Sequence, residues 1–447
     1  MNAQARLASA FDAAAPAVIA ACVLAAAAGS SIQRGILAAG GPLRSVMLGV
    51  LLVFALVRAA FSFSVWRFPR RTTFALAAFC GLAVVSVGWS VNPHGTLVRA
   101  LGVGSVVVAC VALTGCVPSR PELADRLLDG VLAGAAFVAL AGFVYWVFAP
   151  HGAVASATSD YPSRFRGIEE NANTAALLLA IGMPLSLARA LRARSAGARA
   201  VYVVALLGFL ASIVASGSRG GLLGGFAGLV AVVALMPAKR AVRIAAALAV
   251  VVALAVSAWT MTIPKALHST SPAAPTPART MYSVNAEDVL PLQQEIGNPW
   301  WTHRSGDSRR SLFNASVRLR AWVGTFHRAL ARPLLGYGFG AEQWAFVNRY
   351  YAYVSQNPEN GYLGLLLQLG FVGPPVFLFA VALCVVPGIR ACLRRQSSAG
   401  YALAAIGAVT AALAAAMSQS YFHGPGSIAF VALWVSLAVA AVAAEAP

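Results

Sequence analysis

The sequence predicts an all-α polytopic membrane protein with about twelve transmembrane helices and one large external loop. Of its 447 residues, 59% are hydrophobic and only 11% are charged, whereas about 25% of the residues of a soluble domain are charged. The mean hydropathy is +0.75, and apolar runs of about 20 residues, the length that crosses a bilayer, recur along the chain. These observations exclude an ordinary soluble domain, and no segment predicts a separate soluble unit.

The apolar runs divide the chain into three parts within a single integrated domain. Residues 1–263 are predicted to hold transmembrane helices one to nine, residues 264–359 a large external loop with amphipathic helices, and residues 360–447 helices ten to twelve. The first run resembles a signal peptide, but its basic region is weak and eleven further runs follow, so we retain it as a span. The predicted spans are 13–31, 44–64, 73–91, 98–116, 128–148, 173–189, 200–216, 221–237, 242–263, 360–387, 400–418 and 426–444.

Arginines predict the orientation, because basic residues in short loops are retained on the cytoplasmic side. With a cytoplasmic N-terminus, every inside loop is basic, and both termini lie inside. The loops at 149–172, 217–220, 264–359 and 419–425 then lie outside.

The net charge of +19 is explained in part by this topology and by anionic membrane lipids, so we expect no nucleic acid partner. Basic residues on the predicted outer side break the topology rule and outnumber the acidic residues there. They predict an anionic substrate on the outer face. They are Arg34, Arg44, Arg99, Arg164, Arg166, Arg219, Lys265, Arg279, Arg304, Arg309, Arg310, Arg318, Arg320, Arg328, Arg332 and Arg349.

Two residue types are interpreted as packing residues. All six cysteines lie in or at the ends of predicted spans without a CxxC or Cys/His cluster, so no metal site is predicted. The glycines of GGLLGGFAG (220–228) lie inside a span and lack the GK[ST] ending of a phosphate loop. They predict close helix packing in the membrane.

The external loop contains an amphipathic pattern at Asn314–Leu330, which Pro333 and the following glycines end. Leu319, Trp322 and Phe326 recur at helical spacing. Two interpretations remain open. The helix lies across the bundle or in the lipid interface with solvated arginines, or Arg318 points into a site and binds a phosphate.

Two further segments carry candidate residues. In SGSRGG (216–221), Arg219 is either an interfacial side chain or a phosphate ligand made accessible by its small neighbours, Ser218 among them. In DYPSRFRGIEENAN (160–173), Arg164 and Arg166 stand beside acidic and asparagine side chains. That segment is either internally neutralised, with an asparagine as a helix cap, or supplies a guanidinium to the site.

These motifs together resemble the O-antigen ligase and Wzy polymerase superfamily, most of all the lipopolysaccharide O-antigen ligases. The matching patterns are SxSRG at 216–220, R-L-x-x-W at 318–322, P-x-x-G-x-G-x-G at 333–340, and Glu359-Asn360 followed after nine residues by G-x-x-G at 370–373. The resemblance implies a GT-C-like membrane fold. It also implies transfer of a glycan from undecaprenyl diphosphate to an acceptor on the periplasmic face of the bacterial inner membrane, without metal or other cofactor.

The resemblance also implies roles for individual residues. Glu359 stands where the family has histidine, and it either accepts the proton of the acceptor hydroxyl or only forms a hydrogen bond there. The implied catalytic residues are Glu359, Arg219 and Arg318; the implied binding residues are Arg166, Arg164, Arg320, Asn360 and Ser218; His423 and Asn173 are further candidates.

The acceptor stays open at this stage. Lipid A core is the acceptor expected for a ligase, whereas a polymerase uses a second lipid-linked glycan and a protein O-oligosaccharyltransferase uses a protein. Outside enzymes, a transporter of lipid-linked glycans is the alternative. Span interiors nearly free of acidic and basic residues argue against coupled transport.

Overall fold

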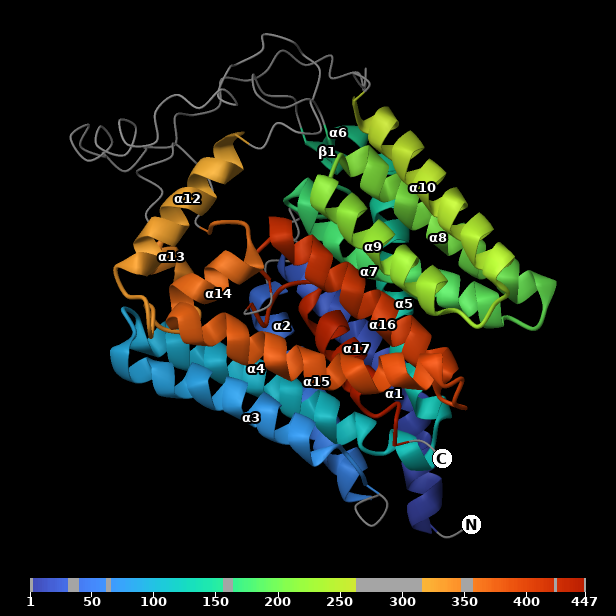
Figure 1. The fold of residues 1–447 in the computed structure, drawn as a ribbon, viewed down its shortest axis with the longest axis horizontal. Coiled ribbons are helices and arrows are strands. Elements are labelled where there is room, and N and C mark those ends of the chain that lie inside the picture. The colour runs from blue at the N-terminus through green and yellow to red at the C-terminus, as the bar shows by residue number, and fades with distance from the viewer. Residues whose placement is uncertain are drawn as a thin grey trace.

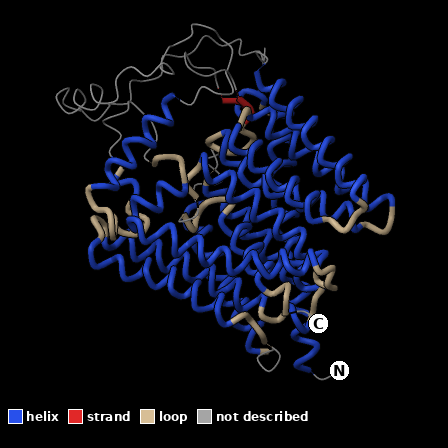
Figure 2. Tube along the Cα trace, in the orientation of Figure 1, coloured by secondary structure: helices blue, strands red, loops and turns tan. Residues whose placement is uncertain are grey.

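The computed structural model describes residues 3–30, 40–61, 66–155, 164–262, 316–346, 357–421 and 424–445. Helices make up most of these residues, as Figure 2 shows. The only strands among them are β1 (Val154–Ala155) and β2 (Arg164–Phe165), which pair antiparallel with Val154 opposite Phe165. The all-α class predicted from the sequence is therefore confirmed for this part of the chain.

The helices form one bundle, and the colours of Figure 1 show their order along the chain. Their bounds are α1 Ala3–Gly29, α2 Gly40–Ala60, α3 Arg70–Val85, η2 Ser86–Trp89, α4 Pro93–Thr114, η3 Val117–Ser119, α5 Glu122–Phe148, α6 Pro150–Ala153, α7 Ala172–Arg192, α8 Ala196–Ser216, α9 Arg219–Leu235 and α10 Arg240–Thr262. After the undescribed segment follow α12 Ser316–Leu330, α13 Glu342–Ala345, α14 Gly361–Leu369, η7 Gly370–Val372, α15 Gly373–Leu393, α16 Ala399–Ala415, η8 Ala416–Ser418 and α17 Phe430–Ala441.

Ten helical segments in the described residues are long and apolar enough to cross a membrane. Two shorter apolar helices, α9 and α17, lie where the remaining two spans were predicted. A polytopic membrane protein is thus supported, while the count of twelve spans remains a prediction.

The segments that connect the helices lie at two ends of the bundle, and hydrogen bonds join several of them at one end. At one end, the Ser30 carbonyl accepts from the Glu170 amide, the Tyr337 carbonyl accepts from the Val91 amide, and Arg44 donates to the Gly426 carbonyl. We call this end, with residues 164–171, 216–219, 331–346, 357–361, 416–421 and 424–429, the loop-rich end. Both termini lie at the opposite end (Figure 1).

Ion pairs join the helices at the opposite end. Asp12 on α1 accepts from Arg58 of α2 at 2.6 Å and from Arg120 at 2.7 Å. Arg189 at the end of α7 lies 2.8 Å from Asp129 of α5. Arg58 is 1% exposed, so its pairing with Asp12 avoids an uncompensated buried charge.

The glycines of α9 allow close contact with α7 and α16, which confirms their interpretation as packing residues. A Cβ atom on Gly221 would lie 2.8 Å from the Ala176 Cβ on α7. One on Gly224 would lie 2.7 Å from the Ala411 carbonyl oxygen on α16, and one on Gly228 2.7 Å from that of Gly407. Small residues are what bring helix backbones together in a membrane.

The span predicted at 360–387 corresponds to the candidate span Gly361–Leu393, but that span is not one continuous helix. The chain forms α14, breaks at Gly370, and continues as α15 in another direction (Figure 1). Gly370 has φ 62° and ψ −162°, a conformation almost restricted to glycine. The Phe371 amide donates to the Pro333 carbonyl at 2.6 Å, and a Cβ on Gly370 would lie 2.4 Å from the Leu334 carbonyl carbon. The break therefore fixes the segment after α12 against α14.

We expect Gly370→Ala to destabilise the protein by at least about 1–3 kcal/mol, the cost of the backbone conformation alone, because its Cβ also meets backbone. The thermal unfolding midpoint of the detergent-purified protein measures this. Gly81→Ala on α3 is the control, since a Cβ there would meet nothing within 4 Å. Equal midpoints for the two variants would contradict the role assigned to Gly370.

Candidate functional site

Helix α12 and the residues before α14 bring Arg318 and Glu359 together. Arg318 Nη2 lies 2.7 Å from Glu359 Oε2, and their side chains are 29% and 18% exposed. One turn after Arg318, the Trp322 indole donates to the Pro358 carbonyl at 3.0 Å. The helix predicted at Asn314–Leu330 corresponds to α12, Ser316–Leu330, and Arg318 of this helix forms an ion pair with Glu359.

The backbone of Glu359 is strained. Its φ is +48°, in the left-handed region that costs a residue other than glycine roughly 1–2 kcal/mol. Such conformations persist where the surroundings hold them, and they cluster at functional sites. Here the contacts of Pro358, the ion pair to Arg318 and the helix cap at Asn360 hold the residue in place.

Asn360 caps the N-terminus of α14. Its Oδ1 accepts from the amides of Tyr362 at 3.0 Å and Leu363 at 3.1 Å, and its own amide donates to Ser420 Oγ at 3.2 Å. Side-chain caps of this kind satisfy helix amides that lack a partner within the helix. Asn360 thus positions the chain next to Glu359, and the substrate contact that the resemblance implies for Asn360 stays a prediction.

A buried carboxylate that the sequence analysis missed connects three segments. Glu342 is 2% exposed; its Oε1 accepts from Ser420 Oγ at 3.0 Å and its Oε2 from Gln368 Nε2 at 3.2 Å. Gln368 Oε1 in turn accepts from the Gly340 amide at 2.7 Å. Gln368 is a polar residue inside the apolar stretch LLLQLG, and this was the available signal.

The junction of α8 and α9 lies at the same end. Gly217 has φ +60°, and Ser218 caps α9 by accepting from the Gly221 amide at 3.3 Å. Ser218 is 2% exposed, so its hydroxyl serves the helix. Arg219, half-buried, is the first residue of α9.

Arg164 joins the segment before α7 to this junction. Its Nε donates to the Ser216 carbonyl and its Nη2 to Asn173 Oδ1, both at 2.6 Å. Arg166 donates to the Gly152 carbonyl at 3.1 Å, and partial burial lowers its pKa. Arg164 and Asn173 therefore hold α7 and α8 together in this structure, and Arg166 holds α6.

Helix η8 and the residues after it link the start of α9 to Asn360 and Glu342. A Cβ on Gly220 would lie 1.7 Å from Ser418 Oγ, so α9 begins against η8. Two residues later, Ser420 binds both Asn360 and Glu342. The structure thus gathers Arg164, Arg219, Asn360, Glu359 and Arg318 at the loop-rich end. His423 and the side chain of Arg320 lie outside the residues described.

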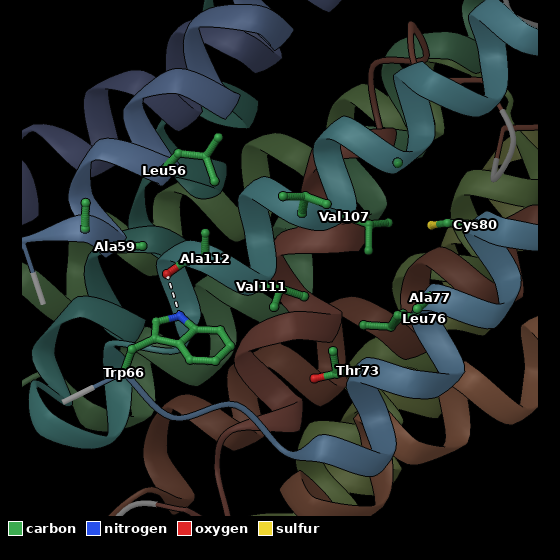
Figure 3. A pocket seen from close by; sticks show the side chains of 13 residues that line it. Leu56, Ala59, Trp66, Thr73, Leu76, Ala77, Cys80, Val107, Val111 and Ala112 are labelled. Carbon is green, nitrogen blue, oxygen red and sulfur yellow. Dashed lines mark hydrogen bonds between the residues drawn. The ribbon is translucent and has the colours of Figure 1, made fainter. Parts of the chain in front are cut away.

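An apolar cavity elsewhere does not fit a polar substrate. It has a volume of about 660 Å³ and lies between α2, α3 and α4, with Leu56, Cys80 and Val107 in its walls (Figure 3). Trp66 closes one part and donates its indole N–H to the Ala112 carbonyl at 3.2 Å. No charged side chain lines the cavity, so it offers nothing to neutralise a diphosphate.

Glu169 is a buried acid near Arg166. It is 0% exposed; Ser30 donates to its Oε2, and its Oε1 has no hydrogen-bond partner among the described residues. Burial raises the pKa of Glu169 to about 8, an effect that the Ser30 hydrogen bond partly offsets. Glu170 beside it is exposed.

This raised pKa predicts a pH dependence of stability. Between the ordinary value of 4.5 and about 8, the folded protein holds a proton at Glu169 that the unfolded chain releases. The stabilisation is complete below 4.5 and is lost as the pH rises through about 8. Unfolding midpoints between pH 5 and 9 should therefore fall less with pH in Glu169→Gln than in wild type and in the control Glu170→Gln. Identical pH profiles for all three proteins would refute this assignment.

Comparison with known proteins agrees with the motifs. Residues 203–378 match a family model described as O-Antigen ligase. The match runs from α8 into α15 and includes Ser218, Arg219, Arg318, Glu359 and Asn360. A search of curated proteins gives no significant match. The family match supports the superfamily of O-antigen ligases and polymerases, and with it a glycan-transfer enzyme that crosses the membrane several times.

Proposed function

We propose that the chain is a glycosyltransferase that ligates O-antigen glycan from undecaprenyl diphosphate to lipid A core. It acts on the periplasmic face of the inner membrane, with both termini in the cytoplasm. The observation that carries the proposal is the Arg318–Glu359 ion pair, which lies within the family match and at the same end of the bundle as Arg219.

The proposed reaction is a single inverting displacement without a metal ion. Glu359 accepts the proton of an acceptor hydroxyl, and the hydroxyl oxygen forms a bond to the anomeric carbon of the first sugar. The bond from that carbon to the phosphate oxygen breaks, and undecaprenyl diphosphate leaves with the electron pair. Guanidinium groups suit its oxygens, and Arg219 is the group we assign to them, with Arg166 as a second.

The ion pair refines the role of Arg318. Its Nη2 contacts one carboxylate oxygen of Glu359, Oε2. We assign Arg318 to hold that carboxylate in the orientation in which its other oxygen meets the acceptor hydroxyl. Positioning of this kind supplies much of the rate in enzymes that do little covalent chemistry.

We expect Arg219→Ala to lower transfer about 10²- to 10³-fold, the usual cost of losing one group that stabilises developing charge, and Glu359→Ala to lower it about 10²- to 10⁴-fold. Purified protein in lipid nanodiscs with undecaprenyl diphosphate glycan and acceptor gives the rates. Arg194→Ala, on the loop between α7 and α8 at the opposite end, should keep the wild-type rate. Full activity of both site variants would disprove the mechanism.

The acceptor consumed separates the ligase from its relatives. Lipid A core, a second lipid-linked glycan and an acceptor protein, offered to the same nanodiscs, should give product with lipid A core alone. Chain elongation on the second glycan would instead establish a polymerase, and a glycosylated protein a protein O-oligosaccharyltransferase. Movement of the donor across the membrane without any product would indicate a transporter.

A further inference from the structure

Two arginines without an assigned role lie inside spanning helices at the loop-rich end. Arg44 is in the first turns of α2, and Arg99 is the seventh residue of α4; both are half-buried. Charged residues within spanning helices are costly and mark functional sites unless they are paired. Arg58, further along α2, shows the paired case, because Asp12 accepts from it at 2.6 Å.

Neither Arg44 nor Arg99 forms an ion pair with a described carboxylate. Arg44 Nη1 donates to the Gly426 carbonyl at 3.2 Å, and Arg99 Nη1 donates to the Gly340 carbonyl. The Arg99 guanidinium also lies over the Trp344 ring, 5.5 Å from its centroid. Backbone carbonyls and an aromatic face orient the two cations, but they do not neutralise them.

The loop that meets Arg44 also packs on the helix of Arg99. A Cβ atom on Gly102, one turn after Arg99, would lie 2.8 Å from Pro425 Cγ, and the next residue of that loop, Gly426, accepts from Arg44. Glu342, two residues after Gly340, accepts from Ser420 and Gln368. A partly dehydrated pair of like charges is expected to attract an anion.

Glycines create the room for both guanidiniums. A Cβ on Gly426 would lie 2.1 Å from Arg44 Cζ, and one on Gly340 2.3 Å from Arg99 Cδ. Gly340 also has φ +70°, which favours glycine. The loops at 340 and 426 thus leave space for the two arginines where any other residue would fill it.

We propose that Arg44 and Arg99 form an anion site that binds a phosphate group of a glycolipid substrate. Arginine offers a planar set of donors that matches phosphate oxygens. The phosphate belongs either to the diphosphate of the donor or to a phosphorylated sugar of the acceptor. The proposal that phosphate binds here depends only on these contacts. The identity of the molecule that carries the phosphate depends on the proposed function.

Inorganic phosphate is the probe for binding. Full-length protein in nanodiscs of zwitterionic lipid is dialysed against labelled phosphate at constant ionic strength. The Arg44→Gln/Arg99→Gln double variant should bind about 10- to 100-fold more weakly than wild type, the usual effect of losing hydrogen bonds from charged groups. Arg71→Gln, an exposed arginine at the opposite end, should bind as wild type does.

Gly426→Ala provides a second variant that keeps every charge. Its methyl group displaces the Arg44 guanidinium, so phosphate binding should weaken although the net charge is unchanged. Wild-type binding by both the double variant and Gly426→Ala would overturn the proposal. An equal loss in Arg71→Gln would also overturn it, because binding would then follow net charge alone.

Transfer kinetics identify the source of the phosphate. A higher KM for a phosphorylated acceptor in the double variant, with unchanged KM for its dephosphorylated form, assigns the site to the acceptor. A higher KM for the donor alone assigns the anion site to the donor diphosphate. An unchanged KM for the donor and for both forms of the acceptor contradicts a substrate site. If wild type transfers no glycan but binds phosphate through these arginines, the proposed function fails and the anion site stands.

Discussion

The carboxylate of Glu342 is the constraint on which the loop-rich end depends. Both of its oxygens accept hydrogen bonds, from Ser420 after η8 and from Gln368 in α14, and it is nearly inaccessible to solvent. Ser420 also binds the Asn360 amide, so the same contacts fix the start of α14 and, next to it, the strained backbone of Glu359. Removing one partner from a buried charged network leaves the other unsatisfied, which is why such networks enforce a single geometry.

Most of the fold follows from the apolar runs of the sequence. A spanning helix must form all of its backbone hydrogen bonds within itself and present apolar side chains to lipid. The run predicted at 173–189 is α7, Ala172–Arg192, and the run at 200–216 ends where α8 ends. The break at Gly370 could not be predicted in this way. A glycine within LLLQLGFVG is as compatible with a continuous helix, and the contacts with Pro333 and Leu334 that require the break come from a segment more than thirty residues earlier.

The candidate site was predictable as a set of residues but not as a geometry. Motif spacing singled out Arg219, Arg318 and Glu359, yet nothing in the sequence pairs Arg318 with Glu359 across the loop. Substrate binding by Arg164 stays a prediction, and its hydrogen bonds to Ser216 and Asn173 could not be read from the sequence. Glu342 was missed because its role arises only when three segments distant in sequence meet. Arg44 and Arg99 were recognised as outer arginines, but their contacts with Gly426 and Gly340 depend on how the loops fold back onto α2 and α4.

In the proposed mechanism, Arg318 and Glu359 act as one unit on the acceptor. A double-mutant cycle with Arg318→Gln, Glu359→Gln and the double variant, measured as kcat/KM for transfer in nanodiscs, tests it most directly. If the pair is one unit, the double variant loses about as much activity as the more damaged single variant. Losses that multiply in the double variant would show that the two side chains act independently and would contradict the account.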